Sequence, residues 1–200
     1  MTTKIQLSDA EMQLMCNADF ILTKNRVLQK TKHLLEEVQQ AQVAAQKGFE
    51  TFSAEVFAAP PKISRGENYL GLPYLILDYP RLLQPQQTFA IRTFFWWGRF
   101  FSSTLQLSGD PKFDFQEKIA AAFDVLAPHY FVGVNPDPWQ HHFERDNYKP
   151  VSQFSQKGFE TFLKEREHIK IARQFPLTDW PEAETLLFNC WKGYLQILSA

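Results

Sequence analysis

The sequence predicts an α+β domain, in which an antiparallel β-sheet is built around a central hairpin and N-terminal and C-terminal helices pack on one face. The hairpin is indicated by two aromatic, β-prone runs, 88–96 and 99–107, on either side of a turn at Gly98. Helical patterns occupy residues 8–46 and 152–198, before and after the strand-rich region. Strands grouped between helices are typical of α+β folds, and short turns between strands favour antiparallel pairing.

The N-terminal helical pattern begins with a capping box formed by Ser8 and Glu11. Apolar residues then recur with heptad-like spacing, at Leu7, Leu14, Ile21, Leu28 and Leu35. One helix over residues 8–46 would be about 58 Å long, which exceeds the roughly 43 Å diameter of a compact chain of this length. We therefore expect a break near residues 16–19, a long helix from about 19 to 46, and a C-cap at Gly48. An unbroken helix would instead predict a homo-oligomer held by this seam.

The sheet region is expected over residues 62–107. Lys62–Ser64 and Tyr74–Tyr79 have strand character, and Pro80 is expected to end the second of these strands. Residues 65–68, Arg-Gly-Glu-Asn, are typical of an ordinary hairpin turn, with a binding loop as the alternative.

After the hairpin, the capping pair Asp114 and Glu117 predicts a helix over residues 115–127, and strands are expected within 129–145. Residues 135–144 contain two prolines, a tryptophan and two histidines, which is unusual for a plain connector. C-terminal helices are predicted over 152–198. Within that stretch, 169–173 fits either a helix end or a short strand, and Asp179 with Glu182 forms another capping pair. The whole chain, residues 1–200, is expected to be a single domain.

Composition limits the functional classes. The chain has 21 basic and 22 acidic residues and a net charge of −1, with no basic stripe of the kind that binds nucleic acid. No apolar run approaches the length of a membrane span, and the first twelve residues lack the apolar core of a signal peptide. We therefore expect a soluble, cytoplasmic protein without nucleic-acid or membrane partners. Its 19 Phe, 6 Tyr and 5 Trp indicate a core dominated by aromatic rings.

Both cysteines, Cys16 and Cys190, lie in helical patterns among apolar residues. This placement predicts two reduced thiols in the core, and a disulfide between the terminal helices is the alternative. The heptapeptide QKGFETF occurs twice, at residues 46–52 and 156–162. Because the flanking sequences differ, the repeat does not indicate a duplicated unit.

The first candidate site is one face of the hairpin. Strand alternation places Arg92 and Trp96 on the same side, and Asp78 shares a side of its own strand with Tyr74. Asp78 and Arg92 either form a structural ion pair, or Arg92 and Arg99 bind a carboxylate or phosphate in an aromatic pocket. The second interpretation makes ligand-binding candidates of Arg92, Arg99, Asp78, Tyr74 and Trp96.

The second candidate site is a histidine cluster, comprising His129, His141 and His142 together with Glu144. Imidazole and carboxylate groups can act as an acid–base pair or ligate zinc. However, the characteristic zinc spacings are missing, and adjacent His141 and His142 would point to opposite faces of a strand. We therefore predict no metal, and an exposed histidine pair is the alternative to a site.

No phosphate loop, dinucleotide fingerprint, metalloprotease motif or hydrolase elbow occurs, so no cofactor is predicted and the sequence does not decide whether the protein is an enzyme. The sequence favours a ligand-binding or protein-interaction module. Its partner would be an unidentified small molecule or protein. One alternative is an enzyme or anion-binding protein that uses Arg92 and Asp78, with His129 or His141 as a further candidate. The other is a purely structural homo-oligomer assembled through the N-terminal helix.

Overall fold

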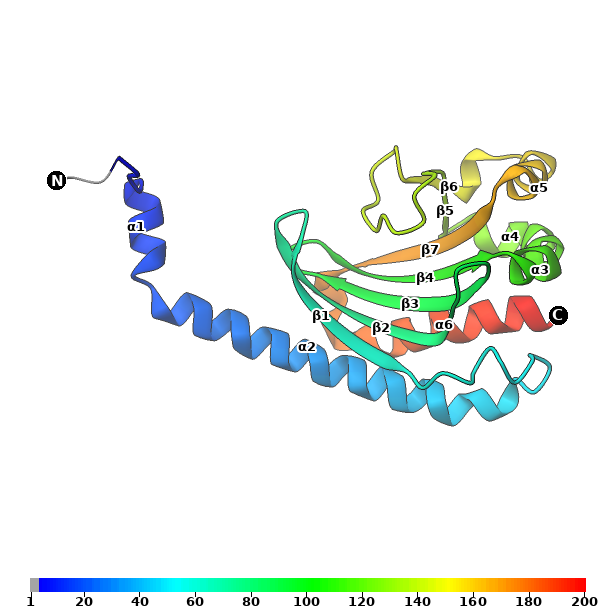
Figure 1. Ribbon diagram of the computed structural model, residues 1–200, viewed down its shortest axis with the longest axis horizontal. Helices are drawn as coiled ribbons and strands as arrows, with labels where there is room; N and C mark the ends of the chain where they lie inside the picture. The colour runs from blue at the N-terminus through cyan, green and yellow to red at the C-terminus, as the bar shows by residue number, and fades with distance from the viewer. Residues whose placement is uncertain (1–3) are drawn as a thin grey trace.

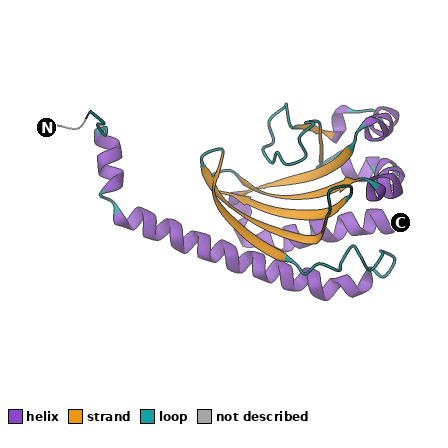
Figure 2. Ribbon diagram, viewed as in Figure 1, coloured by secondary structure: helices purple, strands orange, loops and turns teal. Residues whose placement is uncertain are grey.

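The computed structural model describes residues 4–200 and contains a seven-stranded antiparallel sheet with strand order β1-β2-β3-β4-β7-β5-β6 (Figure 1 and Figure 2). The strands are β1 Lys62–Tyr69, β2 Leu72–Leu83, β3 Thr88–Trp96, β4 Phe100–Ser108, β5 Phe131–Gly133, β6 Tyr148–Pro150 and β7 His168–Pro176. The α-helices are α1 Asp9–Met15, α2 Ala18–Ala45, α3 Asp110–Ala121, α4 Phe123–Leu126, α5 Gln156–Glu165 and α6 Ala183–Ser199. Short 3-10 turns follow α2 and precede α5 and α6. The predicted α+β class is confirmed.

The central hairpin is confirmed as β3 and β4, the third and fourth strands of the sheet. Their register is unbroken from Thr88 opposite Ser108 to Trp96 opposite Phe100. The tight turn between them requires a positive φ of 68° at Gly98, a conformation that glycine adopts without steric penalty. Nearly every residue of both strands is buried, so both faces of the hairpin are covered.

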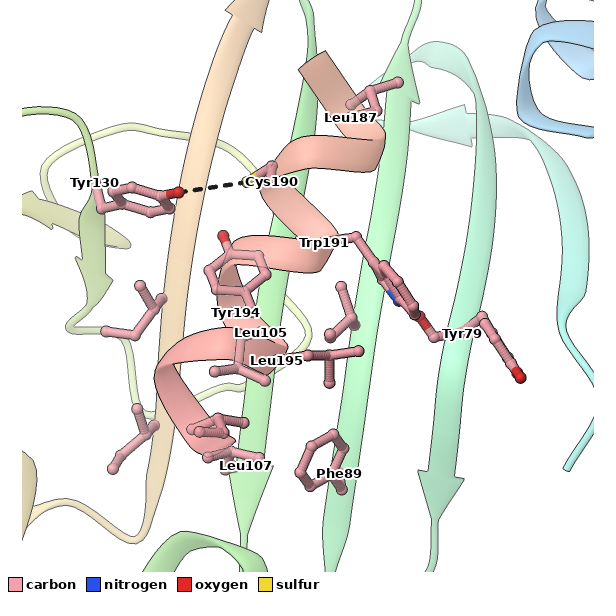
Figure 3. Packing of buried hydrophobic residues seen from close by; sticks show 14 of the residues in the cluster. Tyr79, Phe89, Leu105, Leu107, Tyr130, Leu187, Cys190, Trp191, Tyr194 and Leu195 are labelled. Carbon is pink, nitrogen blue, oxygen red and sulfur yellow. Dashed lines mark hydrogen bonds between the residues drawn. The ribbon is translucent and has the colours of Figure 1, made fainter. Parts of the chain in front are cut away.

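One face of the sheet is covered by α2 and α6, which run along it (Figure 1). Strand alternation directs Phe89, Leu105 and Leu107 toward α6, where Trp191 and Tyr194 are fully buried (Figure 3). Aromatic rings dominate these contacts, as the composition predicts.

The N-terminal helices match the predicted arrangement. Ser8 and Glu11 form the capping box of α1. The helix is interrupted at Cys16, and Asn17 then caps α2. The carboxamide oxygen of Asn17 accepts the amide hydrogen of Phe20, which starts the second helix. The predicted cap at Gly48 is wrong, because α2 ends at Ala45 and is followed by a 3-10 turn that includes Gly48.

The first hairpin differs from the prediction at both ends of β2. Residues 65–68 lie within β1, and the turn is formed by Leu70 and Gly71 because the Asn68 side chain accepts the amide hydrogen of Gly71. Pro80 does not end β2: the strand continues to Leu83 past a register shift between Asp78 and Arg81. Such a shift leaves backbone groups near the proline unpaired in the ladder, which a residue without N–H tolerates.

The segment after the hairpin also departs from the prediction. Helix α3 begins at Asp110, five residues before the expected start, because Pro111 occupies the first turn, where its fixed φ suits a helix. The predicted strand region 129–145 contains only β5; residues 134–147 form a long loop that leads to β6.

Helices do not continue throughout 152–198, because residues 168–176 form β7. Of the two alternatives for 169–173, the strand is confirmed. Strand β7 pairs with β4 over its full length and with β5 on its other edge. Ile169, Ile171 and Phe175 alternate toward the helix-covered core, a period of two that supports a strand. Asp179 and Glu182 do not cap α6: they lie in a 3-10 turn, and α6 starts at Ala183 without a side-chain cap.

The two cysteines have different surroundings, and both are free thiols. Cys190 is buried in α6, where its Sγ lies 3.9 Å from the hydroxyl of Tyr130, so the core prediction holds for this residue (Figure 3). The prediction is wrong for Cys16, which is exposed at the break between α1 and α2, away from the packed core.

Candidate functional site

The long loop at residues 134–147, between β5 and β6, lies over the sheet face opposite α2 and α6 (Figure 1). The hydroxyl of Tyr69 accepts the backbone amides of His141 and His142, at 2.7 and 3.0 Å. Within the loop, the Asn147 side-chain amide donates to the carbonyl of His142. These bonds satisfy backbone groups that have no strand partner, and they fix the path of the loop over the sheet.

Beneath the loop, Asp78 and Arg92 face each other across β2 and β3, the arrangement that the structural ion pair requires. The Arg92 Nε and Nη2 atoms donate to the two carboxylate oxygens of Asp78, at 2.7 and 2.9 Å. The Asp78 and Arg92 side chains are only 10% and 14% exposed. Neither residue lines any of the five surface cavities described for residues 4–200, and the carboxylate-binding edge of the guanidinium is already occupied.

The third contact of Arg92 joins the sheet to the loop. Its Nη1 lies 3.1 Å from Nε2 of His141, and its guanidinium lies 5.5 Å from the ring centre of Trp139. Burial, reinforced by the charges of Arg92 and Lys170, holds the pKa of His141 well below its ordinary 6.5. A guanidinium can only donate, so Nε2 of the neutral imidazole accepts this bond and Nδ1 carries the proton.

A buried lysine completes the cluster. Lys170 on β7 is 1% exposed, and its Nζ donates to the carbonyl of Gln140 and lies 4.8 Å from the ring centre of Tyr148. Burial, together with the charge of Arg92, lowers the pKa of Lys170 to about 8, although Asp137 opposes the change. The sequence prediction did not single out Lys170, because it left the conformation of residues 169–173 undecided. The available signal was a lysine between two isoleucines in a stretch that could form a strand.

We expect the wild-type protein to gain stability from Lys170 as the pH rises from about 8 to 10.5. In this range the unfolded side chain, with its ordinary pKa of 10.5, binds a proton that the folded side chain has released. The free energy of unfolding therefore rises by at most about 1.4 kcal/mol per pH unit from this group. Urea unfolding of wild type and Lys170→Met should be measured below pH 8 and near pH 10. The free energy of unfolding of wild type, relative to that of the variant, should be higher near pH 10. A difference that does not change with pH would contradict the lowered pKa.

A second part of the same face contains a surface cavity. A cavity of about 470 Å³ lies beside the β3–β4 turn, where the hairpin meets the loop. Its walls include Trp96, Arg99 and Phe100 from the hairpin and His142, Phe143 and Glu144 from the loop. Four residues of the two predicted clusters, Trp96, Arg99, His142 and Glu144, therefore line one cavity.

The hairpin side of this cavity combines a fixed aromatic ring with an available cation. Trp96 is 5% exposed; its indole N–H donates to the carbonyl of Tyr69 at 3.1 Å, and its ring packs edge-on against Tyr69 and Phe100. The guanidinium of Arg99 lies 5.4 Å from the Trp96 ring centre. Within residues 4–200 this exposed guanidinium takes part in no ion pair, so its donors remain available to an acceptor.

The loop side of the cavity carries an unsatisfied polar atom. Nδ1 of His142 is buried without a hydrogen-bond partner, and the nearest acid is the carboxylate of Asp146, at 3.9 Å. A buried polar atom left unpaired is destabilising and uncommon in folded proteins. Glu144 adds an exposed carboxylate to the same wall. The cavity lining thus combines aromatic rings with a cation, an anion and an imidazole.

The remaining predicted residues lie elsewhere. Tyr74 packs its ring on Gly66 of the neighbouring strand and contacts the ring of Phe94, outside the lining of this cavity. His129 is exposed in the turn before β5, next to Tyr130, which packs against α6 on the other side of the sheet. Among residues 4–200 there is no group of three or more His, Cys, Asp or Glu side chains arranged to hold a metal ion.

The chain was compared with protein-family models, with curated proteins and with solved structures, and none of the three comparisons finds a match. Over the same described residues, no helix combines the length and the apolar character needed to cross a membrane.

Proposed function

We propose that the protein is a binding module for a small carboxylate-bearing or phosphate-bearing molecule with an apolar or aromatic body, held in the cavity beside the β3–β4 turn. The observation that carries this proposal is the guanidinium of Arg99, which has no acidic partner among residues 4–200 and lies over the fixed ring of Trp96 at a cavity of about 470 Å³. That volume falls within the range of small-molecule sites, which is roughly 300–1,000 Å³.

The two ends of the proposed ligand meet different chemistry. The planar fork of Arg99 can bind two oxygens of a carboxylate or phosphate, and its guanidinium makes a cation–π contact with Trp96, 5.4 Å from the ring centre. The apolar body would lie against Trp96, Phe100 and Phe143, which already pack on one another and lose little conformational entropy on binding.

Glu144 narrows the ligand class. A carboxylate on the wall opposes a ligand with a high negative charge, so it favours carboxylates and ligands that also carry a donor or a cation. No serine, threonine, cysteine or lysine lines the cavity, which favours binding over catalysis through a covalent intermediate.

We expect phenylacetate or L-phenylalanine to bind saturably, with quenching or a shift of tryptophan fluorescence, and inorganic phosphate to bind more weakly because it has no apolar body. Arg99→Gln should weaken binding at least about tenfold, because a charge-assisted bidentate contact is lost. The affinity of Arg99→Lys should lie between those of wild type and Arg99→Gln, because an ammonium keeps the charge but not the two-donor geometry of the guanidinium. Titration calorimetry gives the dissociation constants independently.

Arg26→Gln, at an exposed position of α2 outside the cavity, is the matched control and should bind as wild type does. Failure of all three probes to bind, or equal binding by wild type and Arg99→Gln, would contradict the proposed site.

A further inference from the structure

The loop between β5 and β6 is held on the sheet through three consecutive residues, 140–142. The hydroxyl of Tyr69 on β1 accepts two of their backbone amides, and Lys170 on β7 donates to one of their carbonyls. Between these bonds, Nη1 of Arg92 on β3 lies 3.1 Å from Nε2 of the His141 ring. Bonds from three strands therefore converge on one short stretch of the loop, with a histidine at its centre.

The bond between Arg92 and His141 requires a neutral imidazole. A guanidinium has only donors, whereas a protonated imidazole donates from both of its nitrogens and accepts at neither. A proton on Nε2 would therefore replace this hydrogen bond with two facing donors and two positive charges. The His141 ring also packs against Phe94 and Tyr69, at ring separations of 5.0 and 5.6 Å, so turning it away from Arg92 would break these contacts.

The cations around His141 oppose its protonation while the loop is closed. Burial is the largest cause of its lowered pKa, and the charges of Arg92 on β3, Lys170 on β7 and the adjacent His142 lower the pKa further. An imidazolium at this position would be the third positive charge in a cluster that already contains a guanidinium and a buried ammonium.

The acids of the cluster are bound elsewhere. Asp78 on β2 accepts Nε and Nη2 of Arg92, and Asp137 in the loop accepts a backbone amide of the loop itself. The aromatic hydroxyl groups of Tyr69 on β1 and Tyr148 on β6 are uncharged in acid. Within residues 4–200, neither carboxylate forms a hydrogen bond or ion pair with the histidine ring, so no acid compensates for an added proton.

We propose that the loop over residues 134–147 is an acid-released latch, in which protonation of His141 breaks the bond to Arg92 and frees the loop from the sheet. The loop supplies His142, Phe143 and Glu144 to the cavity beside the β3–β4 turn, so its release removes one wall of that cavity. The consequence for ligand binding rests on the proposed function, whereas the release itself does not.

The direction of the pH dependence follows from linkage. In the released loop the imidazole is solvated and has its ordinary pKa of 6.5, whereas the closed loop holds the pKa of His141 well below that value. The released form therefore binds the extra proton as the pH falls below 6.5, and the closed form is fully favoured only above it. Between the two pKa values, the equilibrium moves toward release by up to about tenfold per pH unit.

Hydrogen exchange followed by NMR, in the ligand-free protein, measures the release. The protection factor, which is the ratio of the intrinsic exchange rate of an amide to its measured rate, reports how often the loop opens. For the amides of His141 and His142, it should fall at least about tenfold between pH 7 and pH 5. The amides of β4, which is paired on both edges, should keep their protection because the sheet stays folded.

Two glutamine substitutions identify the group that titrates. In His141→Gln, the carboxamide oxygen can accept the bond from Arg92 but takes up no proton, so the protection factors should change less than about twofold over the same pH range. His142→Gln is the matched control. The ring of His142 lies 3.9 Å from the carboxylate of Asp146, an acid that favours its protonated form, so this variant should respond to acid as wild type does.

An NMR titration of the His141 ring tests the same step in the unsubstituted protein. The ring signals should shift over the pH range in which the loop amides lose protection. Unchanged protection of these amides in wild type at pH 5 would overturn the latch. So would an equal loss of protection in His141→Gln, a parallel loss throughout β4, or a ring that titrates while the loop stays protected.

Discussion

Replacing Asp78 by alanine is expected to lower the free energy of unfolding by about 3 kcal/mol, at the lower end of the range for breaking a buried ion pair. The substitution leaves the Arg92 guanidinium, whose side chain is 14% exposed, without its carboxylate. The remaining neighbours cannot replace it, because His141 is neutral and Lys170 adds a second positive charge. Urea unfolding near pH 7 measures the change.

The matched control for Asp78→Ala removes both charges together. Asp78→Leu combined with Arg92→Leu should recover most of the lost stability, because neither member of the ion pair is left buried without the other. The double variant should still loosen the loop over 134–147, since the contact from Arg92 to His141 is lost. A loss below about 1 kcal/mol in Asp78→Ala would be typical of an exposed pair and would contradict the buried geometry.

Replacing Trp191 by alanine is expected to cost about 3–5 kcal/mol, the range for a large aromatic residue in a core. Trp191 is fully buried in α6, stacks on Tyr79 at a ring separation of 6.3 Å, and donates its indole N–H to the carbonyl of Tyr79 at 2.7 Å (Figure 3). The variant therefore leaves a cavity and an unpaired buried carbonyl between α6 and β2. Thermal and urea unfolding give the change in stability.

Two further substitutions separate these contributions. Trp191→Phe keeps an aromatic ring but leaves the Tyr79 carbonyl unpaired, so about 1–3 kcal/mol should be lost. Trp180→Ala is the matched control: Trp180 is 37% exposed in the turn before α6, and its loss should be well under half that of Trp191→Ala. Equal effects at the two tryptophans would contradict the packing of α6 on the sheet.

Helix ends and turns that are set by neighbouring residues were predicted correctly from the sequence. The capping box at Ser8, the break before Asn17 and the turn at Gly98 each depend on residues within a few positions. The pairing of Asp78 with Arg92 also followed from alternation once the two strands were taken as neighbours. Errors occurred at Pro80 and in β7, where pairing with distant strands decides the conformation.

The two copies of the heptapeptide QKGFETF show the limit to which local sequence determines conformation. At residues 46–52 it forms a 3-10 turn and a bend in which Phe52 packs on Phe89 and Phe115. At residues 156–162 the same letters open α5, because Ser155 caps the helix by accepting the amide hydrogen of Gly158. Identical residues thus adopt two conformations, and the cap and the packing partners decide between them.

The sequence by itself determined the fold class, the starts of α1 and α2, and the central hairpin, because capping and strand alternation act over a few residues. Only the tertiary structure decided that Arg92 is clamped by Asp78 and His141, while Arg99 meets His142 and Glu144 at a cavity. That division depends on where the loop over 134–147 crosses the sheet, which is set by bonds from Tyr69 and Lys170. Contacts between residues so far apart in the chain leave no periodic pattern in the sequence.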